Sequence, residues 1–358
     1  MATFTHVMQR LRKRARRRIQ RVRRRAVLPS FWLRFDEEAR VCPACRSSRL
    51  ALLDLLRVRG DLTGRRLAFL TGCEECGLVF VNPMPPPELL DRFYGEEGVW
   101  GAAHAERAAR IAAAHARRVA RNQAPKSGRR PKRVLLLDAM QPYVPVDAPP
   151  PGAKVIDFGC GEGKLLNTLQ EAGWDTYGIE PSTDVAFLRH QRLETVPQDG
   201  TFDLVILHHV LEHVPNPLEV LQQLAGALRP GGILFIGVPR LDTLPQHGDF
   251  KYCINGRNHL VSFTETCLRA LLGRAGFEVA ARLDAPELDA AFTHGTPLRL
   301  RLLARRTATP PLLPDDPLQP ARRALGAHRR ARMRLTERLG VSLPPRLRGA
   351  WMQWNLTP

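Results

Sequence analysis

The chain has 358 residues, enough for one large domain and one small one, and 44% of its residues are hydrophobic, enough for a sizeable core. The net charge of +19 comes from the two ends: residues 1–30 hold eleven basic side chains and no acid, residues 321–358 hold nine arginines and one acid, and residues 31–320 carry 34 of each sign. No run of 18 uncharged apolar residues occurs, and no apolar segment follows the basic N-terminus, so neither a membrane span nor a secretory signal is predicted.

The first segment is predicted to be a basic helical tail over residues 1–30, because apolar residues recur among the arginines at spacings of three and four. A small domain follows at residues 31–100, with short β-like runs at 66–71 and 78–81. Residues 101–133 begin rich in alanine and arginine, which predicts a helical linker.

From residue 154 onward, strand and helix patterns alternate. The predicted strands are 155–158, 175–180, 202–207, 233–238, 277–283 and 297–305, and the predicted helices are 164–172, 217–228 and 264–275. Such repeated units imply an α/β fold with a mainly parallel sheet and helices on both faces. We assign residues 134–309 to this domain, although 134–137 fit a strand or a helix equally well. Residues 310–358 form a basic C-terminal tail with a second predicted helix at 321–339.

A glycine-rich turn joins the first strand of this domain to its first helix. Gly159 and Gly161 allow a tight turn and a close approach of the backbone to a ligand. Lys164 stands at the third glycine position of a dinucleotide-binding fingerprint, which argues against that ligand. Asp157 would repel a pyrophosphate but suits an ammonium group, and Glu180 can accept hydrogen bonds from both hydroxyls of a ribose. A ligand with a ribose, an ammonium group and no phosphate matches S-adenosylmethionine.

The glycine turn and Glu180 are followed in order by the motifs FDLV (202–205), LEHV (211–214), LRPGG (228–232) and GF (276–277). Over residues 130–306 this series resembles the class I S-adenosylmethionine-dependent methyltransferases. The resemblance implies a Rossmann-like fold and a site for that cofactor. The expected cofactor-binding residues are Asp157, Gly159, Cys160, Gly161, Glu180, Asp199 and His208. A Rossmann-like domain that binds another nucleoside is the alternative.

The sequence departs from this family between Glu180 and Phe202. The family usually has a helix, a third strand and an acidic residue near the adenine in this region. Only 21 residues separate the two positions here, which is fewer than usual. Asp199 stands near the expected place of the acidic residue, so we assign it to the adenine.

Four of the seven cysteines form two C-x-x-C pairs, which are Cys42 with Cys45 and Cys73 with Cys76. With no export signal predicted, metal binding is favoured over disulfides, and four thiolates make a closed tetrahedral site with a structural role. A redox C-x-x-C is the alternative. Together with the run LVFVNP at 78–83, the pairs resemble a zinc-ribbon head that a subset of these methyltransferases carries, although Arg46 stands where many of them have glycine. The resemblance implies one structural zinc ion and, since several such enzymes act on small molecules, an acceptor of that kind.

Methyl transfer is an in-line displacement that mainly needs alignment, with a base only where the acceptor's proton has a high pKa. The candidate catalytic residues are His209 and His213, which follow the strand at 202–207, and His259 in a later loop that often reaches the substrate in this family. His209 and His213 are spaced i, i+4, so a metal pair is an alternative, and a purely structural role is another.

We expect methyl transfer from S-adenosylmethionine to a small molecule or to a glycan- or lipid-type intermediate. An RNA methyltransferase that uses the basic tails and a non-catalytic, methyltransferase-like binding protein are the alternatives. The tails, with Trp351 and Trp354, suit an anionic membrane surface or nucleic acid, unless they are solvated and disordered. We expect a cytoplasmic protein, peripheral to a membrane if the tails bind one.

Overall fold

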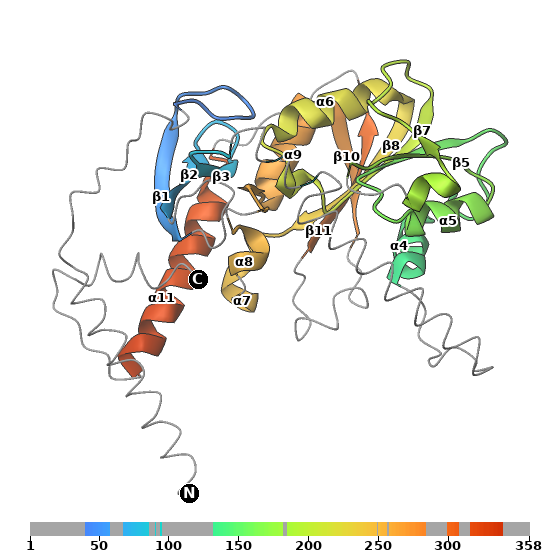
Figure 1. Ribbon diagram of the computed structural model, residues 1–358. Helices are drawn as coiled ribbons and strands as arrows, with labels where there is room; N and C mark the ends of the chain where they lie inside the picture. Colours follow the sequence, from blue (N-terminus) through green and yellow to red (C-terminus); the bar gives the residue numbers. More distant parts are fainter. Residues whose placement is uncertain are drawn as a thin grey trace, which may run out of the picture.

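The computed structural model describes residues 40–57, 67–85, 90, 94, 132–181, 185–248, 250–255, 258–283, 299–307 and 316–338. The predicted N-terminal helix, nearly all of the predicted helical linker, Trp351 and Trp354 lie outside these ranges. The described residues form a sheet of seven strands and a sheet of four strands (Figure 1).

The larger sheet has the strand order β10-β11-β8-β7-β4-β5-β6. Its strands are β4 (Lys154–Phe158), β5 (Asp175–Ile179), β6 (Gln191–Arg192), β7 (Phe202–His208), β8 (Leu228–Pro239), β10 (Phe277–Arg282) and β11 (Arg299–Arg306). The pairs from β8 to β6 are parallel, and β11 is antiparallel to both of its neighbours. The predicted α/β fold with a mainly parallel sheet is confirmed, and each predicted strand of this domain is present.

Helices cover both faces of this sheet (Figure 1). They are α4 (Lys132–Met140), α5 (Lys164–Glu171), α6 (Pro217–Ala227) and α9 (Glu265–Arg274). Successive side chains of a strand point to opposite faces. Ile156 and Val205 accordingly pack in one core with α6 and α9, whereas Val155 and Leu204 pack in another with α4 and α5. Residues 134–137, which the sequence left as either strand or helix, belong to helix α4.

The smaller sheet is antiparallel and has the order β1-β2-β3-β9. Its strands are β1 (Leu50–Arg57), β2 (Leu67–Cys73), β3 (Val79–Asn82) and β9 (Val261–Ser262). Strands β2 and β3 match the predicted β-like runs. Strand β9 comes from the chain between β8 and β10, so a segment of the predicted methyltransferase domain completes the small sheet.

Helix α11 (Gln319–Arg338) matches the predicted C-terminal helix and lies beside the small sheet (Figure 1). Ala321 and Leu325 are buried in a core with Leu70 of β2 and with residues of α7 (Leu244–His247) and α8 (Phe250–Cys253). Arg322 pairs with Glu74 at 2.6 Å and Arg329 with Asp54 at 3.4 Å. Part of the predicted C-terminal charge is therefore used in contacts within the protein. In the described part of the chain, no helix combines the length and the apolar character needed to cross a membrane.

Candidate functional site

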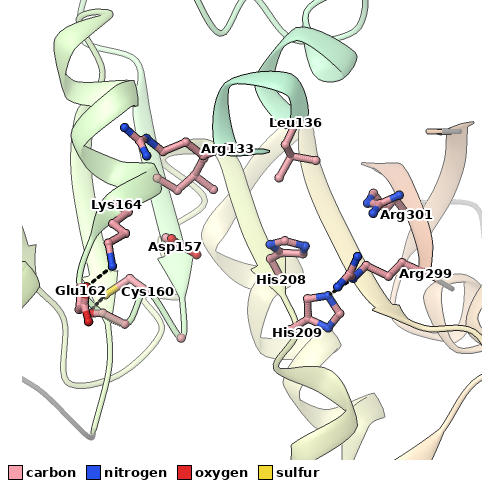
Figure 2. A pocket seen from close by; sticks show the side chains of 13 residues that line it. Arg133, Leu136, Asp157, Cys160, Glu162, Lys164, His208, His209, Arg299 and Arg301 are labelled. Atoms are coloured by element: carbon pink, nitrogen blue, oxygen red, sulfur yellow. Dashed lines mark hydrogen bonds and ion pairs between the residues drawn. The ribbon is translucent and has the colours of Figure 1, made fainter. Parts of the chain in front are cut away.

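A cavity of about 370 Å³ lies where β4 and β7 end. Figure 2 shows side chains from the glycine turn on one side and from β7 and β11 on the other. The residues that line the cavity are Arg133, Leu136, Asp157, Gly159, Cys160, Gly161, Glu162, Lys164, Leu165, His208, His209, Arg299 and Arg301. Its volume lies in the range of small-molecule sites, and it is placed at the sheet edge where α/β proteins bind ligands.

The glycine turn has the backbone geometry that requires glycine. Gly159 and Gly161 have φ angles of 81° and 54°, in the left-handed region that side chains disfavour. A Cβ atom on Gly159 would lie 2.3 Å from Cγ2 of Val210, so a side chain there would collide with the segment after β7. The turn therefore brings bare backbone to the cavity, as the sequence predicted.

Asp157 is the penultimate residue of β4 and is only 5% exposed. Burial, together with the nearby charge of Glu180, raises the pKa of Asp157 to about 7. A cationic group in the cavity would favour the ionised carboxylate and offset that burial. Asp157 is thus placed to recognise a positive charge.

Glu180 follows β5 and accepts a hydrogen bond from the backbone N–H of Gly161 at 2.9 Å. The carboxylate is therefore next to the glycine turn, although Glu180 does not line the cavity itself. Cys160 lies in the turn between Gly159 and Gly161. Its Sγ atom packs against Gly178 of β5, and burial raises the pKa of its thiol. A raised pKa disfavours the reactive thiolate form of Cys160, which still lines the cavity as predicted for a cofactor contact.

The expected position of Asp199 beside the adenine is not matched by the structure. Asp199 precedes β7, at the opposite edge of the parallel sheet from the glycine turn, where it accepts hydrogen bonds from the backbone and hydroxyl of Thr201. The short segment after Glu180 forms the 3₁₀ turn η2 (Val185–Leu188) and the two-residue strand β6 instead. After β6 ends at Arg192, the chain returns to the opposite edge of the sheet to begin β7, and Asp199 lies at the end of that return.

His208 and His209 line the cavity opposite the glycine turn (Figure 2). Burial lowers the pKa of His208 well below its usual range, so its ring is neutral. His209 has a φ angle of 60°, a strained conformation for a residue with a side chain. Its Nδ1 atom lies 3.0 Å from Oε1 of Glu212, and its Nε2 atom accepts a hydrogen bond from Arg299 at 2.8 Å. Both ring nitrogens of His209 are therefore used within the protein.

His213 and His259 do not line the cavity; they lie together behind His209, with their ring centroids 4.9 Å apart. His213 ends the 3₁₀ turn η3 (Leu211–His213), so it is not on one α-helical face with His209 as its spacing suggested. The metal pair of His209 and His213 is not supported, because His209 already binds Glu212 and Arg299.

The cationic residues of the cavity, above all Arg299 and Arg301, were not predicted from the sequence. Both come from β11 and sit at alternate positions, so they share one face of the strand. Arg301 is only 3% exposed, and the guanidinium of Arg299 also lies over the ring of Tyr252, 5.6 Å from its centroid. Two arginines spaced i, i+2 in a strand with buried leucines are the signal that predicts this site.

The four paired cysteines come together at the start of the small sheet. Their Sγ atoms all lie within 4.8 Å of one another, with Cys42 3.7 Å from Cys76 and Cys45 3.5 Å from Cys73. These separations are too long for disulfides, whose sulfurs lie about 2.05 Å apart. Arg46 has a φ angle of 65°, which explains why glycine suits this position in similar sequences.

Comparison with known proteins identifies the family to which the chain belongs. A sequence-family model described as a methyltransferase domain matches residues 104–282, half of the chain. The chain belongs to the methyltransferase-domain family. This methyltransferase-domain protein is also similar to ubiquinone biosynthesis O-methyltransferases: it is 34% identical over 111 residues to that of Xanthomonas campestris pv. campestris, covering 26% of the chain and 46% of the relative. The same protein of Actinobacillus pleuropneumoniae is 35% identical over 104 residues, covering 24% and 44%. The methyltransferase-domain protein therefore spans just under half the length of these curated relatives.

Solved structures that resemble this methyltransferase-domain protein include an S-adenosylmethionine-dependent methyltransferase from Mesorhizobium loti, with 20% identity, a TM-score of 0.37, and coverage of 48% of this chain and all of that one. Another is 1,6-didemethyltoxoflavin-N1-methyltransferase from Burkholderia thailandensis, with 1,6-didemethyltoxoflavin and S-adenosylhomocysteine bound. It has 18% identity, a TM-score of 0.38, and coverage of 69% and 98%.

Proposed function

We propose that this protein transfers the methyl group of S-adenosylmethionine to a small-molecule acceptor. The observation that carries the proposal is the buried carboxylate of Asp157 beside the left-handed turn at Gly159 and Gly161, at the ligand-binding edge of the sheet. This arrangement suits a ligand with a cationic end, because the carboxylate would repel a phosphate bound at the turn. Glu180, whose carboxylate accepts a hydrogen bond from Gly161, would bind the hydroxyls of a ribose.

When bound, S-adenosylmethionine supplies an activated methyl group, so the protein mainly has to hold and align the two reactants. Asp157 would bind the ammonium end, and Glu180 the ribose hydroxyls. Arg299 lies on the far side of the cavity, where His209 fixes its guanidinium. From there Arg299 can donate hydrogen bonds to an oxygen of the acceptor and orient it.

The acceptor we propose is a small molecule or a glycan- or lipid-type intermediate that carries oxygen groups. Three arginine side chains, those of Arg133, Arg299 and Arg301, line the cavity and favour acceptors with partial or full negative charge. The names of the curated relatives, which are O-methyltransferases of ubiquinone biosynthesis, support a small acceptor. Binding of RNA or an anionic membrane by the basic N-terminal segment remains a separate prediction.

We also propose that the four cysteines hold one structural zinc ion. In a tetrahedral site with Zn–S bonds of about 2.3 Å, neighbouring sulfurs lie about 3.8 Å apart. The observed separations of 3.7 and 3.5 Å between sulfurs of different C-x-x-C pairs fit this geometry. Four thiolates leave no open position on the metal, so its role would be to hold the small sheet together.

Calorimetry with S-adenosylhomocysteine, which lacks the reactive methyl group, tests the proposed cofactor. We expect one binding site per chain in the full-length protein. Transfer of label from methyl-tritiated S-adenosylmethionine to the small-molecule fraction of a cell extract then tests the activity. Absence of S-adenosylhomocysteine binding in folded protein would contradict the proposal.

A further inference from the structure

A second cluster of polar side chains lies directly behind the cavity wall formed by His209. It consists of Glu212 and His213 from η3 and His259 from the loop before β9. The two segments are joined by the backbone hydrogen bond from Leu260 to the carbonyl of Glu212, at 2.8 Å. The cluster is thus built into the fold at the point where the two sheets meet.

Both histidines are oriented by backbone carbonyl groups. Nδ1 of His213 lies 2.7 Å from the carbonyl oxygen of Asn258, and Nδ1 of His259 lies 2.7 Å from that of Tyr252. A carbonyl oxygen can only accept, so each Nδ1 atom carries the proton, and each Nε2 atom keeps its lone pair. Such a hydrogen bond from Nδ1 fixes the tautomer and the ring orientation of a histidine that binds a metal through Nε2.

Glu212 brings a buried carboxylate to the same place. Its side chain is 1% exposed, and Oε1 lies 3.0 Å from His209 and 4.0 Å from Nε2 of His213. Among the described residues, Oε2 of Glu212 has no hydrogen-bond partner. A buried carboxylate oxygen without a partner is costly, and a bound cation would remove that cost.

We propose that Glu212, His213 and His259 bind a divalent transition-metal cation. The three ligand atoms lie within 4.8 Å of one another. Metal–nitrogen and metal–oxygen bonds of about 2.1 Å place tetrahedral ligands about 3.4 Å apart, so small side-chain rotations would close the site. Two imidazoles and one carboxylate favour zinc, iron or manganese over calcium and magnesium, which prefer oxygen ligands alone.

Three protein ligands leave at least one coordination position for water or another oxygen ligand. His209 separates the metal site from the cavity and contacts Glu212 on one side and Arg299 on the other. The metal would therefore add positive charge next to the wall where we place the acceptor. Metal binding at this cluster does not depend on the proposed methyl transfer, so the two can fail separately.

Titration of the full-length protein with Mn²⁺, followed by electron paramagnetic resonance, tests this site. Mn²⁺ prefers oxygen and nitrogen ligands, so the four cysteines do not compete for it. We expect one bound Mn²⁺ per chain, displaced by Zn²⁺. Glu212→Gln and His259→Gln should each weaken Mn²⁺ binding by about tenfold or more.

His190→Gln is the matched control, because His190 is also buried and bonded to Thr176 but lies outside the cluster. It should leave Mn²⁺ binding unchanged. His259→Gln keeps an N–H donor for the carbonyl of Tyr252. If Glu212→Gln fails to fold, Mn²⁺ binding by His259→Gln still tests the proposed site. Equal Mn²⁺ binding in the wild type, His259→Gln and His190→Gln, or none in the wild type, would overturn the proposal. Retained binding of S-adenosylhomocysteine in the same samples would leave the proposed function standing.

Discussion

Arg299 donates a hydrogen bond from Nε to Nε2 of His209 across 2.8 Å, which joins the last strand of the sheet to the turn after β7. His209 adopts a strained backbone conformation there, so the pair holds a defined geometry at the cavity. We infer that the bond positions the guanidinium of Arg299 toward the acceptor.

Replacement of Arg299 by alanine should slow methyl transfer about tenfold to a hundredfold, because an orienting hydrogen bond and a cation are lost. Affinity for S-adenosylhomocysteine should stay unchanged, since Asp157 and the glycine turn, to which Glu180 is bonded, lie on the other side of the cavity. Transfer of tritium from labelled S-adenosylmethionine measures the rate. Arg305→Ala, at an exposed position near the far end of the same strand, is the control, and an equal loss in both variants would contradict this role.

Replacement of Glu180 by alanine should weaken binding of S-adenosylhomocysteine by about 1–3 kcal/mol, the contribution of hydrogen bonds to a charged group. Asp199→Ala should leave the affinity unchanged, because Asp199 lies at the opposite edge of the sheet. Calorimetry on the two variants distinguishes the positions. A loss in Asp199→Ala that matched that of Glu180→Ala would mean that the segment after β6 reaches the adenine after all.

The raised pKa of Asp157 predicts a pH-dependent stability. Its folded pKa of about 7 exceeds the unfolded value, so ionisation costs the folded state stability as the pH rises from about 4 to about 7. Asp157→Asn removes this cost. Without ligand, the variant's stability relative to the wild type should rise by on the order of 2 kcal/mol between pH 5 and pH 8.

Urea unfolding at the two pH values measures this difference. Saturating S-adenosylhomocysteine should stabilise the wild type at pH 8 but add little to Asp157→Asn, because the amide cannot pair with the ammonium group. If the difference between the two proteins is the same at both pH values, Asp157 does not titrate as described.

Replacement of Cys73 and Cys76 by serine should lower the zinc content by about one equivalent per chain. The small sheet should then lose protection against hydrogen exchange, because metal binding and folding are coupled in such domains. Elemental analysis gives the zinc content. Cys253→Ser is the control, since Cys253 is buried but lies outside the four-cysteine cluster; zinc retained in the double variant would exclude the site.

Deletion of residues 1–30 should abolish sedimentation of the protein with anionic vesicles. These residues carry eleven basic side chains, each worth about 1 kcal/mol near such a surface. RNA added as a competitor shows whether the same charges also bind nucleic acid. Equal sedimentation of the full-length and shortened proteins would rule out a membrane role for this segment.

The sequence determined those features that depend on neighbours along the chain. The alternation of strands and helices from residue 154, and the glycines that turn the backbone at Gly159 and Gly161, follow from local periodicity and backbone sterics. The two C-x-x-C pairs also predicted that the four cysteines lie together, because the short spacing within each pair already brings two of the thiols close to each other.

Only the tertiary structure decided which distant segments meet. Strand β9 joins the small sheet, and α11 packs against it, through contacts between residues far apart in the sequence. The same pairing places Asp199 at the wrong edge for a cofactor contact, brings Arg299 to His209, and gathers His259 with Glu212 and His213. Local patterns carry no information on such contacts, because the register of the sheet and the packing of its faces are set by burial of the whole core.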